Sequence, residues 1–145
     1  MLPPVAGPRK LLDVLPPALI AVTLVLSALV RRPGFTQGGL ASHDVGGILY
    51  NAMLLRSGGL PYVDSVEWKG PGSFYLAALF AGPRGTDIAA LQIAANCVAL
   101  ASLALVAALA WRLWGPVAAI GAAALFALHD AHLDSMDANY VTWAL

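Results

Sequence analysis

The sequence predicts an all-α integral membrane protein with about three transmembrane helices and the start of a fourth. Of its 145 residues, 59% are hydrophobic and 11% are charged, and the mean hydropathy is +0.75. A soluble domain carries about 25% charged residues. Charges are also absent from three long stretches, residues 14–30, 88–111 and 113–128. As helices these stretches would be about 24 to 36 Å long, close to the roughly 30 Å of a bilayer's hydrocarbon core.

The residues at the ends of these stretches set the expected limits of each span. Pro16-Pro17 falls in the first turn of the first span, where a missing backbone N–H costs least. Thr86-Asp87 is a plausible N-cap for the second span, and Trp111 and Trp114 around Arg112 are typical of a membrane interface. We expect a disordered lead at residues 1–12 and a membrane domain at residues 13–145. Within this domain we expect spans near residues 13–30, 86–112 and 115–130, and the start of a further helix at residues 138–145.

The charge balance and the single cysteine limit the function classes. The net charge is zero, so nothing favours a nucleic-acid partner. Cys97 alone cannot form an intramolecular disulfide, and we expect it to be a buried, inert thiol. Arg9-Lys10 before an apolar run also fits a signal peptide, but Arg31-Arg32-Pro33 is a poor cleavage site. We therefore expect an uncleaved membrane anchor.

The loop between the first two spans, residues 31–85, is expected to contain two short helices. In the segment from Asp44 to Arg56, the apolar residues recur at helical spacing: Val45, Ile48, Leu49, Ala52 and Leu55. Gly58-Gly59 would end this helix, residues 60–72 are rich in turn formers, and Phe74 to Ala81 form a second apolar helix. Both helices are too short to span, so we expect them along the membrane surface.

The two ends of the chain leave its extent and its orientation open. The helix that starts at residue 138 has only about eight residues, too few to span, which suggests a fragment of a larger parent or a truncated gene. Arg9 and Lys10 favour a cytosolic N-terminus. Arg31 and Arg32 favour a cytosolic location for the opposite end of the first span, which is the reverse orientation. The positive-inside rule alone does not decide the orientation.

An ordered set of motifs crosses the loop and the following spans. An Asp opens a surface helix at 44–50, Gly-Gly-Leu-Pro-Tyr-Val-Asp follows at 58–64, and Trp-Lys-Gly-Pro-Gly leads into an aromatic helix at 68–75. An acidic residue, Asp134 or Asp137, then enters a later helix, and Asp44 and Lys69 are 25 positions apart. This set resembles the N-terminal part of the GT-C membrane glycosyltransferases, nearest to the protein O-mannosyltransferase-like and RgtA/B/C/D-like enzymes.

The resemblance implies a function and a topology. Such enzymes take a sugar from a polyprenyl-phosphate donor and place it on a glycan, lipid or protein acceptor at the extracytoplasmic face. The chain would then be a multi-pass protein of the plasma (inner) membrane, with a cytosolic N-terminus and residues 31–85 outside. Two positions depart from the family pattern. Trp68 stands where many members carry His or an acid, and Gly70 replaces the first proline of the turn.

Two acids are the candidate catalytic residues. Asp44, at the start of a helix, could simply be an N-cap. The resemblance implies instead a general base that deprotonates the acceptor as it attacks the anomeric carbon. Asp137, in preference to Asp134, resembles the second acid of the family and would lie opposite Asp44.

Basic residues of the loop are the candidates for the donor phosphate. Lys69 lies in a Gly/Pro turn, where it could be a solvated charge or could bind the donor's lipid phosphate as the leaving group. Arg56 is a second candidate for the same phosphate. Arg84 is a third, and it could equally be an interfacial anchor.

Aromatic and metal-ligating residues complete the candidate site. Four aromatic side chains could contact sugar or lipid, although any interfacial helix carries such residues: Tyr50, Tyr62, Trp68 and Tyr75. No cofactor is expected with certainty. A divalent cation could bind the polar connector at 129–137, alone or with His43 and Asp44, and its candidate ligands there include His129, His132 and Asp134. Their spacing fits no standard metal motif, and a solvated loop is the simpler interpretation. The alternative function is a non-catalytic small membrane protein or an inactive fragment.

Overall fold

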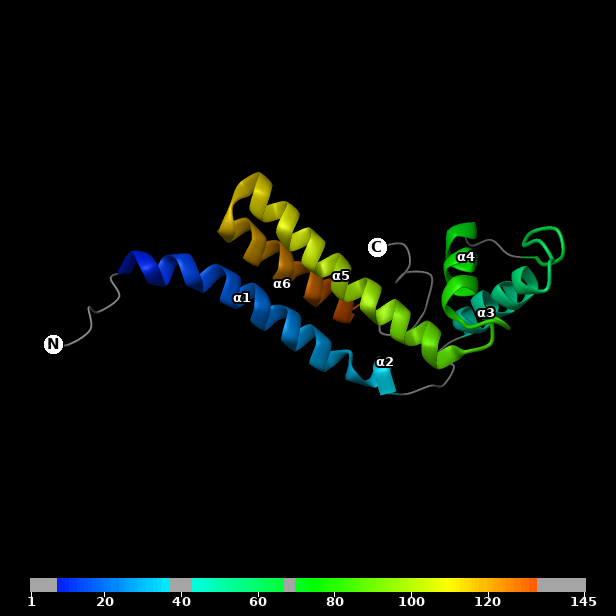
Figure 1. Ribbon diagram of the computed structural model, residues 1–145. Coiled ribbons are helices and arrows are strands. Elements are labelled where there is room, and N and C mark those ends of the chain that lie inside the picture. The colour runs from blue at the N-terminus through cyan, green and yellow to red at the C-terminus, as the bar shows by residue number, and fades with distance from the viewer. Residues whose placement is uncertain (1–7, 37–42, 67–69, 133–145) are drawn as a thin grey trace.

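The protein is all-helical in the computed structural model, which describes residues 8–36, 43–66 and 70–132, with side chains for 14–36, 44–66 and 70–129. Within these ranges every regular element is an α-helix and no strand occurs. The helices in chain order are α1 (Pro8–Val30), α2 (Arg32–Thr36), α3 (His43–Arg56), α4 (Pro71–Phe80), α5 (Ile88–Trp114) and α6 (Pro116–His132). Figure 1 shows α1, α5 and α6 side by side, with α3 and α4 gathered beyond the N-terminal end of α5.

Helices α1, α5 and α6 pack through small side chains. A tight turn at Gly115, whose φ is +89°, joins α5 to α6, and α1 contacts both. The buried residues of α5 and α6 in this bundle are mostly alanines: Ala99, Leu103, Ala107, Ala110, Ala119 and Ala123. Large apolar side chains point outward instead, and Val22, Leu105 and Leu125 are each more than half exposed. Small residues allow helix backbones to approach closely, which is the packing typical of membrane helices.

One helix in the described part of the chain, α5, is long and apolar enough to cross a membrane. Its 27 residues correspond to about 40 Å. The apolar part of α1, Val14–Val30, and that of α6, Pro116–His129, are shorter. The expectation of three spans is therefore supported by length and composition for the second span only, and the start of a fourth at 138–145 lies outside the described residues.

The predicted limits of the helices differ from the structure by a few residues. Helix α1 begins at Pro8 and continues through Pro16 and Pro17, so it overlaps the expected lead at 1–12. Helix α5 begins two residues later than expected and ends two residues later. The expected N-cap is confirmed, because the Asp87 carboxylate accepts a hydrogen bond from the Ala90 backbone N–H at 2.9 Å. Helix α2 was not expected from the sequence.

Helices α3 and α4 form a separate layer with its own apolar core, which we call the α3–α4 unit. The predicted inner face of α3 is confirmed, since Val45, Ile48, Leu49 and Ala52 are buried and Leu55 packs against them. These residues meet buried side chains of α4 and of the first turns of α5: Phe74, Ala77, Ala78, Leu91 and Ala95. The unit is thus attached to the N-terminal end of α5.

Two tight contacts fix the connections of the α3–α4 unit. Gly85 has φ +70°, and a Cβ there would lie 2.8 Å from the backbone carbon of Ala52. Only glycine fits such an approach, which presses the α4–α5 turn against α3. After α3, the Ser65 hydroxyl donates to Asn51 Oδ1 at 2.6 Å, and Asn51 is buried. The α3–α4 and α4–α5 connections are therefore both held against α3.

One expectation about α5 is wrong. Cys97 was expected to be buried, but its side chain is exposed on the surface of the chain. The next residue back, Asn96, is fully buried. On a helix, neighbours in sequence point about 100° apart, so an all-apolar helix does not reveal which of its faces meets protein.

Candidate functional site

The candidate base, Asp44, lies in the first turn of α3. The helix begins one residue earlier, at His43, so Asp44 is inside the helix rather than its N-cap. Its side chain is half-buried, and the following residue, Val45, is fully buried in the core. The core contact of Val45 therefore holds in place the helical turn that carries Asp44. A carboxylate in this position also interacts favourably with the positive end of the helix dipole.

Arg56 lies at the opposite end of the same helix. Its Nε donates a hydrogen bond of 2.7 Å to the backbone oxygen of Ala78 on α4. Twelve residues separate it from Asp44, which amounts to about 18 Å along the axis and a rotation of about 120°. The two candidates therefore face different parts of the surface. The structure does not bring the expected base and this expected phosphate ligand together.

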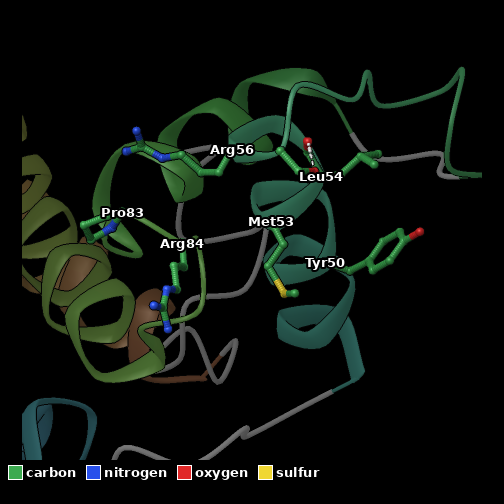
Figure 2. A pocket seen from close by; sticks show the side chains of 7 residues that line it. Tyr50, Met53, Leu54, Arg56, Pro83 and Arg84 are labelled. Carbon is green, nitrogen blue, oxygen red and sulfur yellow. Dashed lines mark hydrogen bonds between the residues drawn. The ribbon is translucent and has the colours of Figure 1, made fainter.

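Arg56 instead lines a surface pocket of about 400 Å³ between α3 and the α4–α5 turn. The lining residues are Tyr50, Met53, Leu54, Arg56, Ser57, Pro83 and Arg84. Figure 2 shows Arg56 and Arg84 on the same side of the pocket with Pro83 between them in this view, while Tyr50 points to the other side. We call this cavity the Arg56–Arg84 pocket. A smaller cavity of about 280 Å³, lined in part by Arg84 and Asp87, adjoins it at the same turn.

The described aromatic candidates do not form one cluster. The ring of Tyr62 packs on that of Phe74, with centroids 5.9 Å apart and planes tilted by 50°. Tyr62 has a φ of +69°, which is uncommon for a bulky residue, and its ring contact helps to hold that turn. Tyr50 and Tyr75 lie on α3 and α4 and are each more than half exposed. Of these residues, only Tyr50 lines the Arg56–Arg84 pocket.

Several candidate residues lie outside what the structure describes. Lys69 and Trp68 fall in one such segment, and Asp134 and Asp137 fall in another. The backbones of His43 and His132 are helical, but their side chains are outside the described set; His129 is exposed near the end of α6. Among the described residues, no group of three or more His, Cys, Asp or Glu side chains could hold a metal ion.

The structure also contains a buried polar contact that sequence reasoning missed. Arg31 follows α1 and is only 2% exposed, and its Nη1 donates to Asn96 Oδ1 on α5 at 2.8 Å. Asn96 in turn donates to the backbone oxygen of Gln92, and both α5 side chains are buried. The sequence contained one signal for this contact, the amide side chains of Gln92 and Asn96 in a long apolar helix. Residues four positions apart lie on the same face of a helix.

Arg31 is buried, although it was counted as a flanking charge of the first span when the membrane orientation was considered. Its guanidinium donates a hydrogen bond to α5. A buried guanidinium requires hydrogen-bond partners, and Asn96 supplies one of them. Arg31 therefore joins the first helix to the fifth, close to the attachment of the α3–α4 unit.

Comparison with known proteins found no relative of this chain. The chain matches no known family model, no curated protein and no solved structure. The likeness to GT-C enzymes consequently stands on the motifs of the chain itself, and its function has to be argued from its own residues.

Proposed function

We propose that this chain is part of a membrane glycosyltransferase that transfers a sugar from a polyprenyl-phosphate donor to an extracytoplasmic acceptor. In this proposal α1, α5 and α6 are three spans of the plasma membrane. The α3–α4 unit lies on the outer surface, beyond the N-terminal end of α5. The acceptor is a glycan, a lipid or a protein.

The outward-facing side chains support the membrane part of the proposal. Leu105 and Leu109 on α5 and Leu128 on α6 are all more than half exposed. Soluble monomers rarely expose continuous apolar surface of this kind, whereas lipid tails are as apolar as leucine. Trp111 and Trp114, beside Arg112 at the far end of α5, suit the opposite membrane interface.

The observation that carries the enzymatic part is the position of Asp44. It is a half-buried carboxylate on a rigid helix, in a unit attached to the end of the helix that can span. An acceptor hydroxyl at this surface would lose its proton to Asp44 as its oxygen attacks the anomeric carbon. The bond between that carbon and the phosphate oxygen then breaks, and polyprenyl phosphate leaves with the electron pair, so the configuration is inverted.

The position of Arg56 on α3 argues against it as a ligand of the leaving phosphate. Arg56 is about 18 Å from Asp44 along α3 and is tied to Ala78, so we do not assign it to the same donor. Lys69 remains the proposed phosphate ligand, with Asp137 as the proposed second acid. A lysine here would stabilise the leaving group by direct charge.

The test is a transfer assay on membranes that contain the protein, with a radiolabelled polyprenyl-phosphate sugar. Asp44→Asn should lower transfer by at least about 100-fold, the usual contribution of a general base. Asp64→Asn is the matched control, because Asp64 is an exposed acid of the same unit that accepts a hydrogen bond from the Leu60 N–H. That variant should retain its activity.

Transfer by the Asp44 variant at the wild-type rate would remove the base assignment. Loss of transfer in both the Asp44 and the Asp64 variant, with normal amounts of protein in the membrane, would mean that the unit needs its acids for structure. Absence of transfer by the wild type with any polyprenyl-phosphate sugar would contradict the glycosyltransferase proposal itself.

A further inference from the structure

The Arg56–Arg84 pocket is built by a close contact between two elements. Gly85 lies against the backbone of Ala52, so the turn that carries Pro83 and Arg84 is pressed onto the last turns of α3. On the α3 side, the hydrogen bond from Arg56 Nε to the backbone oxygen of Ala78 holds the guanidinium group against α4. The pocket therefore belongs to the rigid part of the α3–α4 unit.

The two arginines give this pocket a positive charge that the described residues do not neutralise. Neither Arg56 nor Arg84 forms an ion pair with any described acidic residue, and the terminal guanidinium nitrogens of Arg56 make no described hydrogen bond. Asp87, the acid nearest to Arg84 in the sequence, accepts from the Ala90 N–H as the N-cap of α5. Arginine binds phosphate oxygens through paired, charge-assisted hydrogen bonds, so the pocket suits a phosphate group.

The other side of the pocket is apolar. Met53 is 44% exposed at its edge, Leu54 and Pro83 line it, and the ring of Tyr50 is exposed opposite the arginines. A small hydrophilic anion would gain nothing from this surface. A ligand with a phosphate at one end and hydrocarbon at the other would use both sides of the pocket.

We infer that the Arg56–Arg84 pocket binds the phosphate of an anionic membrane lipid. The phosphate lies on the arginine side of the pocket, and the upper part of an acyl chain lies along Met53 and Leu54. This site is separate from Asp44 and does not depend on the proposed glycosyl transfer. Its effect is to hold the α3–α4 unit against the bilayer surface.

The experiment measures thermal unfolding of the full chain in a neutral detergent, titrated with phosphatidylglycerol, phosphatidylcholine or inorganic phosphate. A ligand that binds the folded state raises the melting temperature with concentration. Phosphatidylglycerol should stabilise the wild type more than phosphatidylcholine, and inorganic phosphate should have little effect. Arg84→Gln should weaken the apparent affinity for phosphatidylglycerol about tenfold, the value of one charged hydrogen bond.

Two further variants separate binding from folding. Arg56→Gln should also weaken lipid binding, but it removes the contact with Ala78, so its melting temperature without lipid should fall as well. Arg32→Gln is the matched control, because Arg32 is an exposed arginine of α2 outside the pocket. It should respond to phosphatidylglycerol as the wild type does.

Each contrary outcome has a definite meaning. If Arg84→Gln binds phosphatidylglycerol as well as the wild type, the site is not in this pocket. If Arg32→Gln loses as much affinity as Arg84→Gln, the lipid responds to overall charge and the pocket is not specific. If inorganic phosphate stabilises the wild type as strongly as the lipid does, the ligand is a free anion and the lipid assignment is overturned.

Discussion

The α3–α4 unit and the α1–α5–α6 bundle differ in the size of the residues that they bury. In the unit, large side chains such as Ile48 and Phe74 are fully buried. In the bundle, alanines such as Ala107 and Ala119 are buried, while leucines such as Leu105 are 70% exposed. The core of the unit therefore mixes large and small residues, whereas a few turns away along α5 the buried residues of the bundle are mostly alanines.

This difference in buried residues is what we expect if the unit lies in water and the bundle lies in lipid. Burial of large apolar groups stabilises a structure in water by about 25 cal/mol per Å² of surface removed. In lipid this driving force is absent between helices, so close packing of small residues and polar contacts hold them together. The proposed membrane placement would therefore account for the two kinds of core, and Arg31 with Asn96 lies near the point where the two regions meet.

The largest expected effect comes from the core of the unit. Phe74→Ala removes a fully buried ring that packs with Tyr62, and it should destabilise the α3–α4 unit by about 3 to 5 kcal/mol. Hydrogen exchange would show this as faster exchange of the α3 and α4 amides. Amides of α6 and of α5 from Leu103 onward should keep their protection, because their buried residues lie outside the core that contains Phe74.

The neighbouring residue provides the control for that substitution. Tyr75→Ala removes a ring that is 57% exposed on the same helix, and exchange in α3 and α4 should hardly change. If Phe74→Ala speeds exchange equally in all helices, the chain unfolds as one unit, and the division into two regions is wrong.

A smaller effect is expected at the contact between the regions. Asn96→Ala removes the acceptor of the Arg31 guanidinium and should cost about 1.5 to 3 kcal/mol, the value of a hydrogen bond to a charged group. Thermal unfolding in detergent would measure the loss. Cys97→Ala is the control, since Cys97 is the adjacent exposed residue on α5 and should be nearly neutral. Equal melting of the two variants would show that the Arg31 contact contributes little.

Local patterns were sufficient to predict the parts of the fold that depend on local chemistry. The inner face of α3 followed from apolar residues repeating every three or four positions, and the N-cap at Asp87 followed from one residue type before an apolar run. Each depends on residues less than four turns apart. The expected limits of these helices were within a few residues for the same reason.

The parts that sequence reasoning missed depend on distant pairs. Arg31 is buried because Asn96, 65 residues later, accepts its hydrogen bond. The pocket exists because Gly85 meets Ala52, which brings Arg84 beside α3. Within α5, apolar residues lie on every face, so no periodicity distinguished the exposed position of Cys97 from a buried one.

We expect the smallest effect from a substitution on the outer face of the bundle. Leu105 is 70% exposed, and if it faces lipid, Leu105→Ala in a bilayer should change stability by less than about 0.5 kcal/mol, because lipid tails replace the lost contacts. Leu103→Ala is the matched comparison, since Leu103 lies two residues away but is 1% exposed. Steric-trap unfolding in bilayers would measure both. A loss at Leu105 as large as that at Leu103 would mean that protein covers this face, and the bundle surface would then be an assembly interface.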